Sequence, residues 1–430
     1  MRLELRITAV VMLAALGAAG CGSAPAGRPQ FSPVISRGVA VREPAADPRP
    51  YGAADTAFGL DMLAAWCRAD PQANLVLSPA SLASGLGMAY LGARGGTAQA
   101  MAGVLRLPVA GHPALEAGLQ ARSAALRGLG SPGVTLAESD QVWADPSLQT
   151  SGSYLNAVAT GYGAGVRRVP LLHNPGQAAQ DINHAIAADT RGQIPQLLNP
   201  VSLHGIGWVL TDALYLNAAW ATPFQASQTS PGPFRTAAGH RVSVSFLRGG
   251  PYRTVRAGGW TAVSLPYRGG KLAMVALLPP AGGGCPVPGA PALGTMTSIL
   301  AGTAPAGATS RPAGTAAFGI ALPKVSLSSK VSMKDLLGQL GMGIAFSPSA
   351  DFTGLSPQAC CIGLVQHAAT LRVAEHGTVA SAATAVGMAP TAVRVEPPSI
   401  VFDRPYLLLV TDTATGEPLF LARVANPATS

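Results

Sequence analysis

The chain has 430 residues and a formal net charge of +9; 48% of its residues are hydrophobic and only 11% are charged. This composition allows a large buried core and excludes a mostly disordered protein. Its Lys and Arg residues are scattered and form no basic stripe with stacking aromatics, so we expect no nucleic-acid partner.

The first twenty residues predict an export signal. Arg2 and Arg6 lie in a short charged region, residues 7–16 are apolar, and small residues lead to Cys21. Ala18-Ala19-Gly20-Cys21 resembles a bacterial lipobox, although Leu is usual where Ala18 stands. We therefore expect removal of residues 1–20, lipidation of Cys21 and a location outside the cytoplasm, on the cell surface. Secretion without a lipid and an uncleaved anchor are the alternatives.

The next segment, residues 21–50, is rich in Pro, Ala, Gly and Ser. Such a segment cannot bury a core, so we expect a disordered tether. A single folded domain is expected to follow over residues 51–428.

Four cysteines lie beyond Cys21: Cys67, Cys285, Cys360 and Cys361. An exported protein allows disulfides. A bridge between the adjacent pair would be severely strained, and the pairing of the four is not readable from their spacing. No Cys-x-x-Cys or His spacing accompanies them, so no metal site is expected.

Helical periodicity and strand-like runs alternate along the domain. Ser78 and Pro79 suit a helix cap and a first helical turn. Arg268-Gly269-Gly270-Lys271 is typical of a hairpin turn, and the Pro-, Gly- and Ala-rich residues 281–317 are expected to be irregular. The mixture predicts an α+β fold with large, mainly antiparallel sheets. Helices are predicted over residues 57–68, 81–92, 98–105, 180–190 and 332–340, and strands over 208–216, 242–247, 263–266, 272–278, 319–325, 364–373, 406–411 and 419–424.

The domain contains a series of short blocks, which are residues 74–81, 91–97, 182–183, 190–194, 210–216 with Trp220 and Phe224, 322–324, 340–342, 350–354, 402–406 and 416–427. Over about 370 residues and in the same order, these blocks resemble the signature blocks of the serpin family.

The resemblance implies a serpin fold, with a large central sheet, further sheets, a cluster of helices and an exposed reactive loop at about residues 375–398. It also implies a monomeric inhibitor of serine proteases that needs no cofactor. No hydrolase elbow, zinc-protease motif or phosphate loop is present, so we expect no enzyme activity. A non-inhibitory serpin that acts as a binding or chaperone-like protein is the alternative.

Residues 375–385 are similar to the hinge of inhibitory serpins, which begins at Glu375. For a loop to enter a formed sheet, alternate side chains must fit into the packed interior. Gly377 supplies backbone freedom at the hinge. Val379 departs from the usual Glu but should point outward. The side chains expected to point inward are Thr378, Ala380, Ala382 and Thr384, which are small and uncharged. An Ala-rich surface linker or helix is the alternative interpretation.

Two further groups follow from the resemblance. Asn74, Ser78, Ser81 and His367 match the shutter, a buried polar cluster beneath the central sheet. Asp212 stands where Asn is typical and is expected to pair with His367 as a carboxylate. Trp220 matches the breach, the place where the loop first enters the sheet.

Two counts locate the bond that the target protease cuts. The seventeenth residue from Glu375, counted inclusively, is Thr391, which places the cut before Ala392. A count back from Pro405 gives Arg394, with the cut before Val395. The forward count is favoured, because loop length up to the cut sets how far the protease is carried. It predicts an elastase-like or subtilisin-like target, and Arg394 would predict a trypsin-like one.

Overall fold

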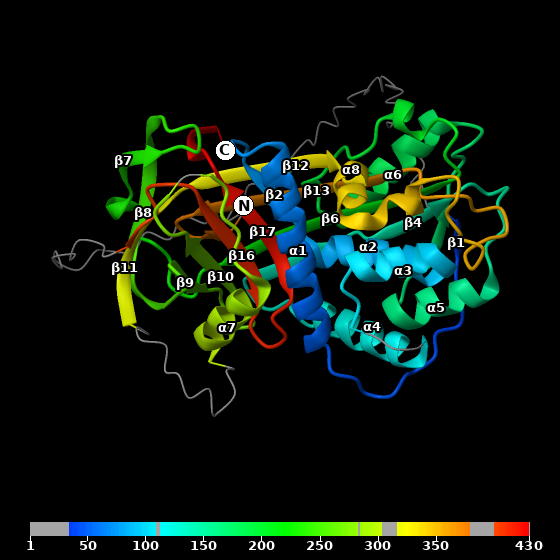
Figure 1. Ribbon diagram of the computed structural model, residues 1–430, viewed down its shortest axis with the longest axis horizontal. Helices are drawn as coiled ribbons and strands as arrows, with labels where there is room; N and C mark the ends of the chain where they lie inside the picture. The colour runs from blue at the N-terminus through cyan, green and yellow to red at the C-terminus, as the bar shows by residue number, and fades with distance from the viewer. Residues whose placement is uncertain (1–33, 109–111, 283, 303–315, 379–399, 430) are drawn as a thin grey trace, which may run out of the picture. The chain divides into compact units, whose positions relative to one another are not determined.

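The computed structural model describes residues 34–108, 112–282, 284–302, 316–378 and 400–429. Two β-sheets and their surrounding helices make up this part of the chain (Figure 1). The α+β fold class predicted from the sequence is confirmed.

The central sheet has eight strands in the order β1-β5-β4-β6-β14-β13-β12, and β3 pairs with β6. Its centre is formed by β6 and β13, which are the two strands that the site depends on. The strands are β1 (Val34–Ser36), β3 (Val134–Glu138), β4 (Gln141–Ala144), β5 (Val166–Arg168), β6 (Trp208–Ala219), β12 (Val325–Ser332), β13 (Val365–Ala374) and β14 (Gly377–Thr378).

The second sheet has nine strands in the order β15-β11-β8-β9-β10-β16-β17-β2, and β7 pairs with β8. Every residue of β10, β16 and β17 is buried, which explains their nearly unbroken apolar runs. Gly269 and Gly270 both adopt positive φ in the β9–β10 turn, as the predicted hairpin requires. The strands are β2 (Leu75–Leu77), β7 (Ser230–Arg235), β8 (Arg241–Ala257), β9 (Trp260–Pro266), β10 (Leu272–Leu278), β11 (Ala316–Pro323), β15 (Ile400–Val401), β16 (Tyr406–Asp412) and β17 (Pro418–Val424).

The helices are α1 (Arg49–Ala69), α2 (Pro79–Gly92), α3 (Gly95–Val104), α4 (His112–Arg127), α5 (Gly152–Tyr162), α6 (Pro175–Asp189), α7 (Ala290–Ala301) and α8 (Lys334–Leu337). Helix α2 is buried on almost every side because it contacts β6 of the central sheet and β17 of the second sheet. Its N-terminus is capped by Ser78, whose Oγ accepts a hydrogen bond from Ser81 N at 3.1 Å. No helix in the described ranges is long and apolar enough to cross a bilayer.

Each predicted helix and strand overlaps an observed one, but three regions differ in kind from the prediction. The region 281–317 was expected to be irregular, yet it contains α7 and the start of β11. Pro291 is tolerated in the first turn of α7, and Gly302 ends the helix at φ +76°. The single strand expected over residues 319–325 is interrupted at Lys324, between β11 and β12. The helix expected over 332–340 divides into α8 and a π-helical turn, η3 (Gly338–Met342).

Regular structure begins at β1 (Val34–Ser36), before residue 51, where the folded domain was expected to start. Strand β1 pairs antiparallel with β5, and the chain beyond it lies along α4 and α5. Val39 N donates to Asn156 Oδ1 at 2.8 Å, and Val41 N donates to Thr160 Oγ1 at 3.0 Å. The tether expected through residue 50 is therefore too long at its C-terminal end, because side-chain acceptors on two helices hold the backbone.

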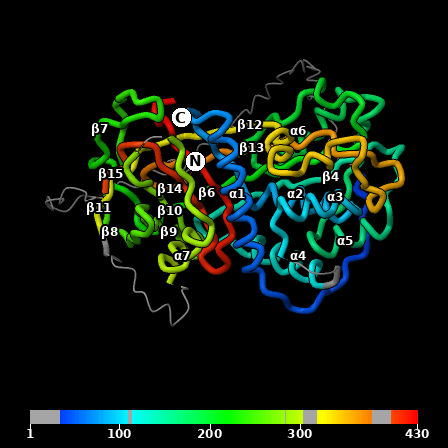
Figure 2. The backbone as a smooth tube through the Cα atoms, in the orientation of Figure 1, coloured from blue at the N-terminus to red at the C-terminus, as the bar shows by residue number. Residues whose placement is uncertain are grey.

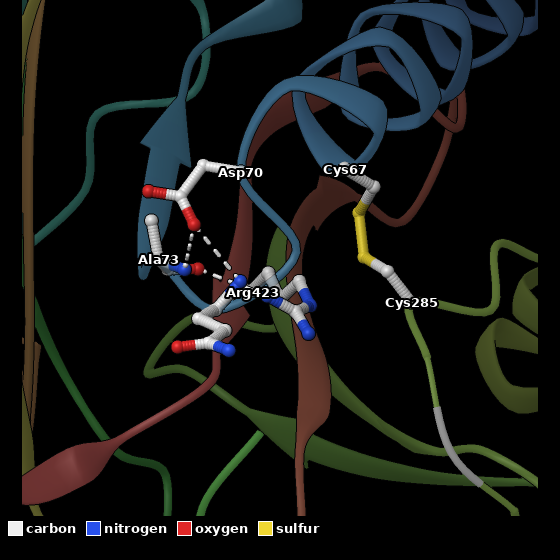
Figure 3. The surroundings of a disulfide bond; sticks show 6 residues. Cys67, Asp70, Ala73, Cys285 and Arg423 are labelled. Carbon is white, nitrogen blue, oxygen red and sulfur yellow. Dashed lines mark hydrogen bonds between the residues drawn. A yellow bond between two sulfur atoms is a disulfide. The ribbon is translucent and has the colours of Figure 1, made fainter. Parts of the chain in front are cut away.

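A disulfide joins Cys67, near the end of α1, to Cys285, before α7, at a sequence separation of 218 (Figure 3). Their Cα atoms are 5.8 Å apart. The turn after α1 is held beside it, because Asp70 Oδ1 accepts Ala73 N at 3.1 Å and Arg423 Nη1 donates to Ala73 O at 3.0 Å. The pairing that the spacing left open is thus settled, and Cys360 and Cys361 are free thiols.

Candidate functional site

Strands β6 and β13 pair at one end and diverge at the other (Figure 2 marks both strands and β14). They pair in parallel from Leu210 with Val365 to Leu214 with Ala369. Beyond that, β14 lies between them and runs antiparallel to both, with Thr378 opposite Val373 on one side and Ala218 on the other. The central sheet is therefore closed at the end where Leu210 pairs with Val365, which we call the foot of the sheet. At the other end, the width of one strand separates β6 from β13.

Trp220 and its neighbours hold the chain as it turns from β13 into β14. Trp220 Nε1 donates to Ala374 O at 2.9 Å, and Trp220 N donates to His376 O at 3.0 Å. Phe224 N donates to Glu375 O at 2.8 Å. The predicted breach residue thus contacts the hinge directly, through both its side chain and its backbone.

Glu375 fixes the hinge to the neighbouring strand. Its Oε1 accepts from Lys324 Nζ at 2.9 Å and from Thr229 Oγ1 at 3.0 Å. Burial raises the pKa of the carboxyl, but the bonds from Lys324, its own backbone and Thr229 outweigh burial, so the pKa lies below its usual value. Glu375 is therefore charged at neutral pH and paired.

Gly377 and Thr378 are the hinge residues that the sheet already holds. Gly377 has φ +153°, and a Cβ there would lie 2.1 Å from Ala218 O, so no larger residue fits. The Thr378 side chain is 0% exposed, and its hydroxyl lies 2.5 Å from that of Tyr267. Tyr267 stacks on Trp220 with 4.6 Å between ring centroids, and burial raises its pKa.

At the closed foot, His367 and Asp212 form a buried hydrogen-bonded pair. His367 Nδ1 contacts Asp212 Oδ1, and both residues are almost fully buried. Ser78 N donates to His367 Nε2 at 3.1 Å, so Nε2 must carry a lone pair and Nδ1 the proton. The backbone of Ser78 thereby sets the tautomer that donates to the carboxylate. The expected contact between Asp212 and His367 is present in the structure.

A second carboxyl group, that of Asp140, lies near this pair and was not found from the sequence. Ser81 Oγ donates to Asp140 Oδ1 at 2.6 Å, while Asp140 Oδ2 is shielded from solvent and has no hydrogen-bond partner. Burial raises the pKa of Asp140 well above its usual value, and the charges of Glu138 and Asp212 act in the same direction. Asp140 is thus harder to ionise than an exposed aspartate.

A buried ion cluster lies beside α2. The Arg122 guanidinium contacts Asp55 and Glu417, at 2.6 Å each, and donates to Ser84 Oγ at 2.9 Å. Burial raises the pKa of Asp55 well above its usual value; the charge of Arg122 opposes this effect, and the charge of Glu417 acts in the same direction as burial. One guanidinium is thus shared by two buried carboxyl groups.

Asn74 was predicted to belong to the shutter, and this prediction is wrong. Its Oδ1 accepts from Ala425 N and Asn426 N at 2.8 and 2.9 Å, so it holds the C-terminal segment. Strand β2 separates Asn74 from Ser78, and four extended residues span about 13 Å. Asn74 and Ser78 belong to the same sequence block, but Asn74 does not lie with Ser78 in the shutter.

The other predicted site residues lie outside the described residues. They are Cys21, Ala380, Ala382, Thr384, Thr391, Ala392, Arg394 and Val395.

The fold and the site define a protein whose central sheet has begun to admit a segment of its own chain as an additional strand. A family profile described as "Serpin (serine protease inhibitor)" matches residues 53–427. An uncharacterized serpin-like protein of Thermococcus kodakarensis is 31% identical over 359 residues, covering 82% of this chain and 81% of the relative. The leukocyte elastase inhibitor of Bos taurus is 28% identical, covering 87% and 99%.

Among solved structures, the native thermophilic serpin tengpin aligns with a TM-score of 0.73 and 22% identity, over 91% of this chain and 97% of tengpin. This chain belongs to the serpin family. It is therefore grouped with protease inhibitors rather than with enzymes.

Proposed function

We propose that this chain is a suicide-substrate inhibitor of a serine protease. The protease serine attacks the carbonyl carbon of the residue before the cut, the peptide C–N bond breaks, and the freed amine stays with the C-terminal fragment. The remaining ester joins the protease to the reactive loop. The loop then continues the insertion that β14 has begun.

The observation that carries this proposal is the agreement of two registers across the opening between β6 and β13. From Ala218 to Leu210 is eight positions, and from Val373 to Val365 is also eight. A strand continuing from Thr378 would therefore place one residue, Val386, against both Leu210 and Val365 at the foot. The opening accepts one continuous antiparallel strand without a bulge.

The same register passes through the shutter. Asp212 and His367 are each six positions from the partners of Thr378, so Thr384 would enter between them. Insertion must break the pair, and the Thr384 hydroxyl offers a donor and an acceptor in its place. At about 0.5–1.5 kcal/mol for each net hydrogen bond, a full strand supplies on the order of 10 kcal/mol.

The register also supports Thr391 as the residue before the cut. Thr391 is five residues beyond Val386, whereas Arg394 is eight beyond it. The shorter connection leaves less slack between the foot of the sheet and the attached protease. Together with the elastase inhibitor among the relatives, this favours an elastase-like or subtilisin-like target.

The test is incubation of the purified protein with elastase, subtilisin and trypsin, followed by denaturing electrophoresis and mass spectrometry. We expect an SDS-resistant complex and a released fragment beginning at Ala392. A fragment beginning at Val395 with inhibition of trypsin alone would replace Thr391 by Arg394. Cleavage by every protease without any covalent complex would overturn inhibition and leave the non-inhibitory serpin.

We also propose that the protein is exported and lipid-anchored through Cys21. The support is the charged, apolar and small-residue order of residues 1–21. This proposal is independent of the inhibitory one.

A further inference from the structure

Two adjacent free thiols lie close together before β13. Cys360 Sγ donates a weak hydrogen bond to Cys361 Sγ across 2.9 Å. Cys360 is exposed and Cys361 is partly buried. The pair is four to five residues before Val365, the first residue of β13 that pairs with β6.

The backbone around the thiols is held on both sides. Ile362 N donates to Ala345 O at 2.9 Å, and Ala359 N donates to Ser356 O at 3.1 Å. Ser151 N donates to Leu355 O at 2.9 Å. Because the segment is fixed, the two sulfur atoms stay near one another, and reaction between them resembles a preorganised intramolecular step.

The two thiols differ in their surroundings. Cys361 lines a small apolar cavity with Trp208, Leu210 and Phe352. Burial raises the pKa of the Cys361 thiol to about 11, and Cys360 acts in the same direction. The thiolate is the nucleophile in disulfide exchange, so the exposed Cys360 should react first and Cys361 should follow.

We propose that Cys360 and Cys361 form a reversible vicinal disulfide, a redox-sensitive site at the foot of β13. The oxidant is a small-molecule disulfide of the glutathione type. The Cys360 thiolate attacks one sulfur of that disulfide, forms a mixed disulfide and releases one thiol. Cys361, losing its proton, then attacks the Cys360 sulfur and expels the second thiol. The protein loses two protons and two electrons, and one small disulfide becomes two thiols.

The geometry makes this bond labile. Adjacent Cα atoms are about 3.8 Å apart across a trans peptide, less than the roughly 4.4–6.8 Å usual in disulfides. A strained and exposed disulfide is readily reduced again and is the kind that serves regulation. Cys67 and Cys285 have Cα atoms 5.8 Å apart, so their bond has the usual span and should persist under the same conditions.

Formation of the Cys360–Cys361 disulfide should change the packing of the central sheet. Cys361 lines the same cavity as Trp208 and Leu210 of β6 and precedes β13 by four residues. Drawing the Cys361 sulfur towards Cys360 changes the packing under the Leu210–Val365 pair, where the two strands must part for a complete strand to enter. Amide exchange in residues 364–369 should therefore differ between the oxidised and reduced forms.

The test uses the full chain in buffers of graded ratios of oxidised to reduced glutathione, with intact mass and unreduced peptide mapping as readouts. Wild type should become lighter by two hydrogen atoms, with the bridge within one peptide. Cys361→Ser should accumulate a glutathione adduct on Cys360, because no second thiol resolves it. Cys360→Ser should acquire a glutathione adduct on Cys361 at a rate at least about tenfold lower than that of Cys361→Ser. The double serine variant should keep only the Cys67–Cys285 bond and show no change in amide exchange.

Three results would each overturn the proposal. One is a wild-type protein that accumulates a glutathione adduct on Cys360 as Cys361→Ser does. Another is a wild-type protein that stays a dithiol under conditions in which Cys361→Ser reacts. The third is formation of disulfide-linked dimers in place of the internal bridge. None of these readouts depends on inhibition of a protease.

Discussion

The hydroxyl groups of Tyr267 and Thr378 lie 2.5 Å apart in a buried contact where β14 enters the central sheet. Tyr267 is stacked on Trp220. Thr378, the first inward side chain of the hinge, therefore lies against aromatic rings and can form a hydrogen bond with the Tyr267 hydroxyl. This position requires a side chain that is both small and capable of hydrogen bonding.

Thr378→Arg should convert the inhibitor into a substrate. An unpaired guanidinium beside Tyr267 opposes insertion by several kcal/mol. The stoichiometry of inhibition should rise several-fold while cleavage of the loop continues. Val379→Arg is the matched control, because alternate residues of a strand point to opposite faces. If Thr378→Arg and Val379→Arg inhibit equally well, insertion is not the step that traps the protease.

Asp140→Asn should stabilise the protein at neutral pH. Because the folded-state pKa of Asp140 is raised, its favourable contribution is complete below the unfolded pKa, near 3.8, and is lost as pH rises through the folded value. Wild type should therefore lose stability above about pH 4, and the amide should remove part of that slope. Thermal unfolding followed by circular dichroism from acid to neutral pH measures it. Asp61→Asn, in an exposed ion pair with Arg106, should leave the slope unchanged. A wild-type slope in Asp140→Asn would contradict the assignment.

Arg122→Met should lower the free energy of unfolding by about 3–5 kcal/mol, because it leaves Asp55 and Glu417 buried without their cation. The exposed pair offers the comparison, since Arg106→Met should cost less than about 1 kcal/mol. Urea unfolding gives both values. Adding Asp55→Asn and Glu417→Gln to Arg122→Met should recover part of the loss. Equal effects at Arg122 and Arg106 would show that the buried cluster is not a stabilising unit.

Cys21→Ser should move the protein from the membrane fraction to the medium, because the lipid would no longer be attached. Fractionation of cells expressing each form and metabolic labelling with a fatty acid measure this. Cys360→Ser is the control, because its thiol lies far along the chain from the export signal. Identical fractionation and labelling of Cys21→Ser and wild type would rule out lipidation.

The sequence predicted those parts of the fold in which local pattern and tertiary role coincide. Strands such as β10 and β16 are buried on both faces, and their apolar runs are visible in any window. Helix α7 was missed because Pro291 and its Gly residues are typical of loops, although Pro is harmless in the first turn. Helices α4 and α5 were also not predicted.

The site was predicted where a family block fixes the spacing, as for Glu375, Thr378 and His367. Asp140 and Arg122 lie outside those blocks. The residues next to an isolated polar residue in the sequence do not indicate whether that residue is buried. Only packing around α2 brings Asp140 to Ser81 and Arg122 to Glu417. Such groups become recognisable once the two sheets are placed on either side of that helix.

The Cys67–Cys285 crosslink also determines how the molecule separates after proteolysis. All five cysteines precede residue 391, so no disulfide can retain the chain that follows a cut at either predicted bond. That C-terminal peptide contains β15, β16 and β17, which pair with β11, β10 and β2 through non-covalent contacts. A cleaved molecule should therefore remain whole in native buffer and release the peptide in denaturant without any reducing agent.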